Sequence, residues 1–241
     1  MKIQTRRLLN VSALAASLLM SACVSGHEFL RNTAAISPVS SVSPETIAMY
    51  DSIEDGDITV PAIPVEYLSE AKKRQLVNYA TNQPSGTIVV DPYARRLYHV
   101  KEDGMAMRYA VAVGAAGYGF SGTARVAYVR DWPGWTPTQN MIKREPEKFA
   151  QFAAGLEGGL ENPLGARALY LYKNGKDTFY RIHGTPSPWT VGQQASSGCI
   201  RMFNQDAIYL ASQVRNGAKV VVLSKQQSAA QNTTTTVDVD A

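Results

Sequence analysis

The chain has 241 residues, of which 45% are apolar, and a formal net charge of +4 at pH 7. The apolar fraction is ordinary for a globular protein, so a sizeable core is possible, and the length fits one large domain or two small ones. Three histidines and two cysteines scattered along the sequence argue against a bound metal ion, and we expect no cofactor.

Residues 1–22 have the three parts of an export signal. A positively charged start is followed by an apolar run over residues 8–20, which is too short to span a membrane. The segment Met20-Ser21-Ala22-Cys23 resembles the lipobox of bacterial lipoproteins, although methionine replaces the usual leucine. We therefore expect a periplasmic protein that is anchored to a membrane through lipidated Cys23. Ordinary signal cleavage near Ala22 is the alternative.

Charge is unevenly distributed along the rest of the chain. Residues 24–85 carry four basic and eight acidic side chains, whereas residues 86–223 carry sixteen basic and ten acidic ones. A basic domain attracts anionic partners by long-range steering. Because an exported protein rarely meets nucleic acid, we expect no nucleic-acid partner. Peptidoglycan stem peptides, which are rich in free carboxylates, suit the compartment better.

Residues 23–85, called the lead segment below, resemble a linker. Residues 24–65 are rich in serine, threonine, proline and acidic residues and show little periodicity. Residues 68–80 are predicted to form a short helix, with Ser69 as its N-cap and the basic run 72–74 on a solvated face.

From Gly86 onward the pattern is one of short strands and turns. Asn174-Gly175 between two apolar runs is a strong signal for a hairpin. We predict a mainly β domain over residues 86–223, built as a sandwich or barrel-like sheet with a few short helices. The expected strands are residues 87–90, 97–100, 105–113, 126–129, 168–172, 178–182 and 220–223.

Two helices interrupt the strands. Residues 146–154 begin with proline and are followed by Gly155, and residues 206–216 carry one apolar face and are followed by Gly217. The last residues, 224–241, include four consecutive threonines and are predicted to be a disordered tail.

Cys199 is the first candidate for chemistry, because an unpaired thiol in an oxidising compartment needs an explanation. His183 lies sixteen positions before it at a strand end, where an imidazole could take the thiol proton. Gly198 would let a substrate approach, and the Cys199 N–H could hold an oxyanion. Spacing alone favours a buried cysteine and a hydrogen-bonded histidine, but the Ser/Gly-rich loop around Cys199 weighs against that reading.

The stretch from His183-Gly184 to Ser196-Ser197-Gly198-Cys199-Ile200-Arg201-Met202 resembles the signature of the YkuD (ErfK/YbiS/YcfS/YnhG-like) L,D-transpeptidases. That family shows a histidine followed by glycine or serine, then a spacer and a Ser-His-Gly-Cys or Ser-Ser-Gly-Cys element. The resemblance covers residues 86–223. Many members carry histidine where this chain has Ser197, but the family's base is the upstream histidine.

The resemblance implies a role for each matching residue. Cys199 would be the nucleophile, His183 the proton acceptor and donor, and Gly184 the residue whose backbone carbonyl orients His183. Ser196, Ser197, Gly198 and Arg201 would bind substrate. Arg201 would pair with a stem-peptide carboxylate, and a structural salt bridge is its equally weighted alternative.

The resemblance also implies a reaction. Cys199 would attack the carbonyl before the terminal D-Ala of a stem tetrapeptide, release D-Ala and keep the acyl group as a thioester. An amine of a second stem would then form a 3–3 cross-link, or a lysine of an outer-membrane lipoprotein would accept the acyl group. Hydrolysis by water, as in an L,D-carboxypeptidase, is one alternative. A non-catalytic wall-binding module is another, but it would be expected to lose the cysteine or the histidine.

Overall fold

The computed structural model of the chain describes residues 42–114, 120–195 and 199–237. These residues belong to the second of two units, which spans residues 40–241. The predicted export signal and Cys23 lie outside the described residues. Within the described ranges, no helix is long and apolar enough to cross a membrane.

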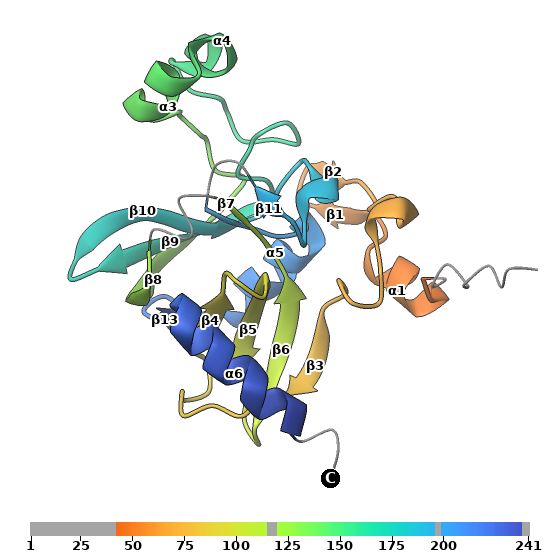
Figure 1. Cartoon of the computed structure of the whole chain (residues 1–241). Helices are drawn as coiled ribbons and strands as arrows, with labels where there is room; N and C mark the ends of the chain where they lie inside the picture. Colours follow the sequence, from red (N-terminus) through yellow and green to blue (C-terminus); the bar gives the residue numbers. More distant parts are fainter. Residues whose placement is uncertain (1–41, 115–119, 196–198, 238–241) are drawn as a thin grey trace, which may run out of the picture. The chain divides into compact units, whose positions relative to one another are not determined.

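Among the described residues, strands are the commonest regular structure, as predicted (Figure 1). A small hairpin pairs β1 (Ile53–Asp55) with β2 (Ile58–Val60). In the described part of the chain, an 11-stranded sheet has the order β11-β7-β12-β10-β9-β8-β13-β4-β5-β6-β3. Its strands are β3 (Gln75–Asn78), β4 (Ile88–Asp91), β5 (Arg96–Val100), β6 (Met105–Ala110), β7 (Ala112–Gly114), β8 (Gly122–Asp131), β9 (Arg167–Lys173), β10 (Lys176–His183), β11 (Gln194–Ala195), β12 (Ile200–Arg201) and β13 (Lys219–Val222).

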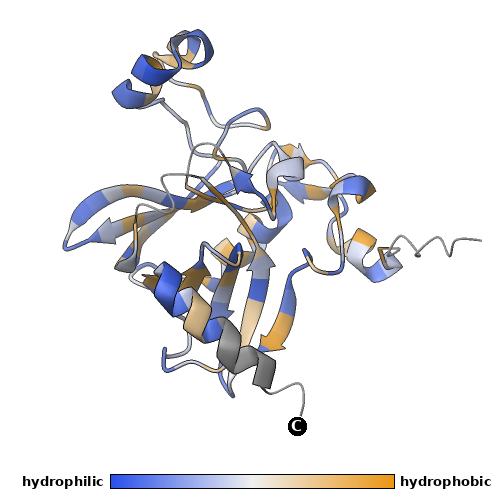
Figure 2. Ribbon diagram, viewed as in Figure 1, coloured by the Kyte–Doolittle hydropathy of each residue, from blue (hydrophilic) through white to orange (hydrophobic). Residues whose placement is uncertain are grey.

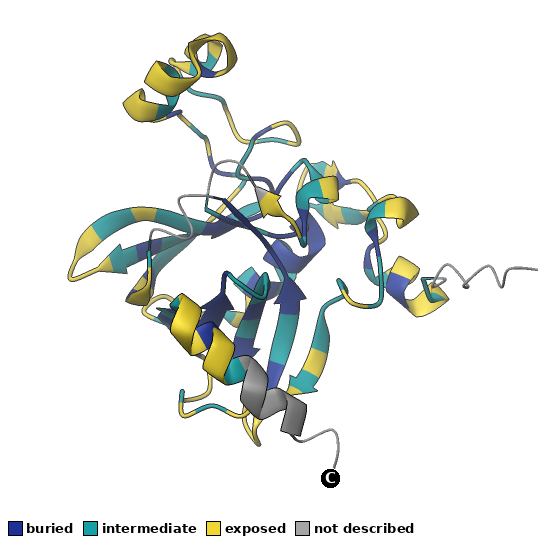
Figure 3. Cartoon of the chain, in the orientation of Figure 1, coloured by how far each residue is buried: buried dark blue, intermediate teal, exposed yellow. Residues whose placement is uncertain are grey.

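The helices are few and mostly short, also as predicted. The α-helices are α1 (Pro44–Met49), α3 (Gln139–Arg144), α4 (Pro146–Phe149), α5 (Asn204–Gln213) and α6 (Lys225–Val237). Single 3-10 turns occur at Val65–Tyr67, Ala150–Phe152 and Pro188–Thr190. Figure 3 shows that α3 and α4 are largely exposed, whereas the residues of strands β4 to β7 are all buried or intermediate.

The sheet curls on itself around one apolar core. Strands β6 and β7 lie near opposite ends of the strand order, yet Val111 alone separates them in the sequence. The chain can pass from one to the other only if the two ends of the sheet come together, which gives the predicted barrel-like arrangement. Apolar side chains of β4 to β10, β12, β13 and α5 fill the interior, and Figure 2 shows hydrophobic residues along many of the strands.

The hairpin between β9 and β10 forms where the sequence predicted it. Asn174 and Gly175 have φ values of 52° and 75° and connect Lys173 to its partner Lys176. Two consecutive positive φ angles are typical of the tight turns that join twisted antiparallel strands.

Two sequence predictions were wrong. Residues 68–80 do not form a helix, because Gln75–Asn78 extend to pair with β6 as the edge strand β3. The predicted disordered tail also forms structure, since Lys225–Val237 is the helix α6. Ser228 on this helix donates to the Asp91 carboxylate over 2.9 Å, and both side chains are buried.

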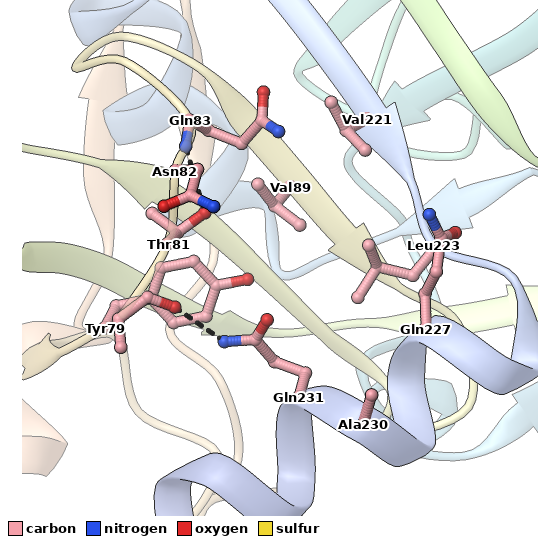
Figure 4. Close-up of a pocket in the computed structure, with 11 residues that line it drawn as sticks. Tyr79, Thr81, Asn82, Gln83, Val89, Val221, Leu223, Gln227, Ala230 and Gln231 are labelled. Carbon is pink, nitrogen blue, oxygen red and sulfur yellow. Dashed lines mark hydrogen bonds between the residues drawn. The ribbon is translucent and has the colours of Figure 1, made fainter.

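Helix α6 partly covers the outer face of the sheet beside β4 and β13. A hollow of about 480 Å³ remains between them, and Figure 4 shows side chains of the helix and of the sheet lining it. Across this hollow, Gln231 donates to the carbonyl of Ala80 over 2.8 Å.

The lead segment lies against the domain, because its polar groups bond to distant parts of the chain. Asp55 on β1 forms a bidentate ion pair with Arg167 at the start of β9, with distances of 2.6 and 2.7 Å. The same carboxylate accepts from Trp132 Nε1 over 2.9 Å. Tyr50 and Leu68 also pack with apolar residues near the core. The order of Asp55 therefore depends on partners that lie 77 and 112 positions later in the sequence.

Candidate active site

Strands β10 and β12 bring the predicted catalytic residues to one face of the sheet. The two strands are parallel, with Ile182 opposite Ile200 and His183 opposite Arg201. The isoleucines are buried in the core, so the next pair, His183 and Arg201, points to the other face. Cys199 precedes Ile200 directly and therefore lies beside Arg181, two residues before His183 along the paired strands.

His183 is held in a defined tautomer. Its Nδ1 lies 2.6 Å from the carbonyl oxygen of Gly184. Because a carbonyl can only accept, Nδ1 carries the proton and Nε2 keeps its lone pair. The imidazole is almost fully buried, with 4% of the residue exposed. An oriented, unprotonated Nε2 is the form that a general base requires.

Burial keeps both His183 and Cys199 neutral. It lowers the pKa of His183 to about 3, and the neighbouring charge of Arg201 adds to this effect. Burial raises the pKa of the Cys199 thiol, although Arg181 and Arg201 oppose the rise. The resting pair is therefore a thiol and a neutral imidazole, so proton transfer has to accompany attack by sulfur on a carbonyl.

Cys199 and His183 line the same cavity, which has a volume of about 500 Å³. Its walls come from strands β9, β10 and β12, from helices α3 and α4, and from the loop that follows His183. Lys148, Arg181 and Arg201 contribute positive charge, and none of the described residues that line the cavity is acidic. The cavity therefore favours a ligand that carries negative charge near the thiol.

Asn204 explains why glycine follows His183. The Asn204 side-chain oxygen accepts from the backbone N–H of Ala166 over 3.0 Å. A Cβ atom at Gly184, or at Gly165 with its φ of +61°, would overlap that oxygen. Only glycine allows the chain after His183 to pass this close, so Asn204 indirectly fixes the carbonyl that holds the imidazole.

The residues predicted to bind substrate are only partly within the described structure. Arg201 lines the cavity, and burial lowers the pKa of its guanidinium. Ser196, Ser197 and Gly198 lie outside the described residues, so their expected role in substrate binding stays a prediction. Trp135 also lines the cavity, whereas Trp132 bonds to Asp55 in the lead segment.

Sequence reasoning did not single out Asn204, Arg181 or the arm that carries α3. The start of α3 had a recognisable signal, because Thr138 caps it by accepting from the backbone N–H of Met141 over 3.2 Å. Among the described residues, no three histidine, cysteine, aspartate or glutamate side chains gather closely enough to hold a metal ion.

Comparison with known proteins gives consistent family matches. The family model for the L,D-transpeptidase catalytic domain, YkuD, matches residues 85–222. The probable L,D-transpeptidase YcfS of Escherichia coli is 32% identical over 145 residues, which are 58% of this chain and 45% of that protein. The putative L,D-transpeptidase YkuD of Bacillus subtilis is 48% identical over 60 residues, which are 25% of this chain and 34% of that protein. The chain thus spans less than half of the length of these curated relatives.

A solved structure from Brucella melitensis, which bears the name of a probable carnitine operon oxidoreductase, is 46% identical to this chain. The match covers 66% of this chain and 98% of that one, with a TM-score of 0.46.

Proposed function

Because the matching domain fills more than half of the sequence, the chain belongs to the YkuD family of L,D-transpeptidase catalytic domains, and we propose that it is a peptidoglycan L,D-transpeptidase. The observation that carries the proposal is one cavity shared by a thiol, Cys199, and an imidazole, His183, whose Nδ1 is held by the Gly184 carbonyl.

The first half of the proposed reaction forms a thioester. As Cys199 Sγ attacks the carbonyl carbon between the third residue of a stem tetrapeptide and its terminal D-Ala, His183 Nε2 takes the thiol proton. The tetrahedral intermediate then collapses and the peptide bond breaks. His183 gives the proton to the departing amine of D-Ala, and the acyl group stays on sulfur. Positive charge from Arg181 and Arg201 would offset the developing oxyanion and the stem carboxylates.

The second half transfers the acyl group to an amine. The side-chain amine of another stem's third residue attacks the thioester, His183 removes its proton, and Cys199 leaves and is reprotonated. The product is a 3–3 cross-link. A lysine of an outer-membrane lipoprotein is the second candidate acceptor. No ATP is required, because one peptide bond is broken for each one that is formed.

Intact-mass spectrometry of the full chain tests the proposed nucleophile. With a disaccharide tetrapeptide donor we expect a mass increase equal to the donor minus D-Ala, and with a carbapenem an adduct on Cys199. Cys199→Ala should give neither species. His183→Gln should slow acylation about a hundredfold or more, whereas His99→Gln, at a buried histidine on β5 outside the cavity, should leave it unchanged.

The products of the same incubation identify the acceptor. Cross-linked dimers are the expected result, and tripeptide alone would assign the protein as an L,D-carboxypeptidase instead. A wild-type chain whose mass changes with neither the donor nor the carbapenem would overturn the proposed activity altogether.

We further propose that the protein is a periplasmic lipoprotein anchored through Cys23. The support is the segment Met20-Ser21-Ala22-Cys23 behind a charged and apolar start. The mature N-terminal peptide should carry a lipid mass on Cys23, and Cys23→Ser should release the protein from the membrane fraction. An unmodified mature N-terminus near Cys23 would instead indicate ordinary signal cleavage.

A further inference from the structure

Strand β10 contains an irregularity beside the nucleophile. Asp177 pairs with Tyr172 of β9, and Arg181 pairs with Tyr170. Four steps along β10 thus face two steps along β9, so β10 carries extra residues that bulge out of the ladder. Phe179, at the centre of this bulge, has a φ of +61° and is 74% exposed. This backbone conformation is unfavourable for a bulky residue, so surrounding contacts have to maintain it.

An ion pair bridges the bulge. The Asp177 carboxylate accepts from both terminal nitrogens of Arg181, each over 2.7 Å. It also accepts from the backbone N–H of Phe179 over 2.8 Å, and the Arg181 guanidinium lies 4.2 Å from the centre of the Tyr170 ring. Because the Arg181 side chain is only 13% exposed and Asp177 is 26% exposed, this pair is better shielded from water than an ordinary surface pair.

The bulge directs backbone groups at the sulfur of Cys199. The thiol donates to the carbonyl of Phe179 over 3.4 Å, and the backbone N–H of Arg181 bonds to the sulfur. The carbonyl of His183, two residues further along β10, accepts from Met202, so the backbone groups of residue 181 face β12 and not β9. The bulge lies directly before this residue and brings the carbonyl of Phe179 to the same sulfur, which is a role often found for bulges near active sites.

The two charges of the pair act on a thiolate with opposite signs. Arg181 lowers the pKa of Cys199 and Asp177 raises it, against a larger increase caused by burial. Among the described residues, the other titratable or charged groups around the thiol are Tyr180 and His183 on β10, Arg201 on β12, Tyr170 on β9 and Lys148 on α4.

We propose that Asp177 and Arg181 are positioning residues that set the reactivity of Cys199: their ion pair maintains the bulge that holds the thiol, and their opposed charges balance its tendency to ionise. This inference rests on the proposed role of Cys199 as nucleophile. It adds two residues that have no part in the predicted signature.

The test measures the rate at which iodoacetamide alkylates Cys199 in the folded full chain as a function of pH. Peptide mass spectrometry separates Cys199 from Cys23. Arg181→Gln removes the cation and leaves Asp177 facing the thiol, so alkylation at pH 7 should slow about tenfold and its pH midpoint should rise. Asp177→Asn leaves the cation unopposed, so alkylation should accelerate about tenfold and the midpoint should fall.

The opposite signs distinguish this proposal from a purely structural role. If the pair only braced the hairpin, both variants would lose the same brace and change alkylation in the same direction, which would overturn the proposal. Unchanged midpoints in both would also overturn it. Arg181→Lys, which keeps the charge without the bidentate contact, should restore part of the rate lost in Arg181→Gln.

Two further measurements complete the test. Glu70→Gln removes a different ion pair, with Lys73 in the lead segment, and should leave the alkylation profile unchanged. Alkylation needs no peptide substrate, so opposite shifts in a chain that never acylates would support the positioning role and refute the transpeptidase. Normal acylation, together with midpoint shifts of the same sign in Arg181→Gln and Asp177→Asn, would support the transpeptidase and refute the positioning role.

Discussion

The sheet and the lead segment are stabilised by different kinds of interaction. The sheet is held by apolar side chains that alternate along its strands and fill one core. The lead segment contributes the edge strand β3 to this sheet, but its described residues before β3 are held largely by single polar contacts. Gln205 donates to the carbonyls of Asp51 and Pro61 over 3.2 and 3.0 Å, and Asp206 pairs with Arg74 over 3.1 Å. A single substitution in the core should therefore destabilise the sheet as one unit. A single substitution at a polar contact should instead release the lead segment alone.

The first turn of α5 shows how closely the two regions are joined. Asn204, Gln205 and Asp206 are consecutive and buried. Asn204 bonds to the loop before β9, and the next two residues bond to the lead segment. This turn begins three residues after Arg201 in the cavity. The lead segment is therefore a support for the site, and four changes of decreasing effect test the comparison.

The largest expected effect comes from Asp206→Ala. The change leaves Arg74 without its buried partner and Tyr50 without the acceptor of its hydroxyl, which lies 3.2 Å away. We expect a loss of about 4 kcal/mol of unfolding free energy, as for other broken buried pairs. Hydrogen exchange should rise first in residues 42–80. The control is Asp206→Asn, which keeps a hydrogen-bond acceptor. Equal hydrogen exchange in residues 42–80 and in the rest of the sheet would contradict the proposed difference between the two regions.

The next effect tests the sheet itself. Leu171 is fully buried in the core, and Leu171→Ala should lower the unfolding free energy by about 3 kcal/mol through lost contacts and a cavity. Urea denaturation measures the loss, and exchange should increase across all strands together. Leu76→Ala, on the edge strand β3 at a side chain that is 54% exposed, should cost far less. An effect confined to one strand would show that the sheet is not one cooperative unit.

Acidification should act on the two regions in opposite directions. Burial lowers the pKa of His99 to about 4, so the unfolded chain binds more protons below about pH 6.5 and stability is lost as the pH falls from there to 4. Burial raises the pKa of Asp206 to about 7 despite Arg74, so its contribution is greatest in acid and is lost as the pH rises to 7.

Urea midpoints at pH 7 and pH 5 measure this difference. Relative to wild type, His99→Gln should retain about 1–2 kcal/mol more stability on acidification, and Asp206→Asn should retain less by a similar amount. If both variants changed the pH profile in the same direction, the assigned protonation of one of the two groups would be wrong.

The smallest effect concerns the hairpin between β9 and β10. Asn174 has a φ of 52°, which alanine adopts unfavourably, so Asn174→Ala should cost about 1 kcal/mol. Asn174→Gly should change stability by no more than a few tenths of a kcal/mol. Thermal unfolding resolves the two variants, and equal losses would show that the side chain matters more than the backbone.

The sequence predicted those parts of the molecule whose signals are local. Strands β4, β5, β9, β10 and β13 were expected from apolar runs and turns, and the Asn174-Gly175 turn from two adjacent residues. Cys199 and His183 were selected by the resemblance and by the lack of another cysteine in residues 86–223. In each case the informative residues lie close together in the sequence.

The remaining features depend on partners far away in the sequence. Arg74 looked like part of a solvated basic run, but its partner Asp206 lies 132 positions later. Polar anchors of this kind have no period, so the lead segment resembled a linker. The bulge at Phe179 was equally hidden, because its conformation depends on Asp177, Arg181 and a sulfur from another strand.

The contact at Asn204 also has an evolutionary consequence. Its side-chain oxygen occupies the space that a Cβ atom at position 165 or 184 would need, and it satisfies the N–H of Ala166. Neither glycine can be replaced while the asparagine remains, and a smaller residue at 204 would leave that N–H without its acceptor. Positions 184 and 204 should therefore vary as a linked pair among related proteins, whereas glycine should persist at position 165, because a Cβ atom there would also lie 2.6 Å from the backbone of Gly184 and Thr185.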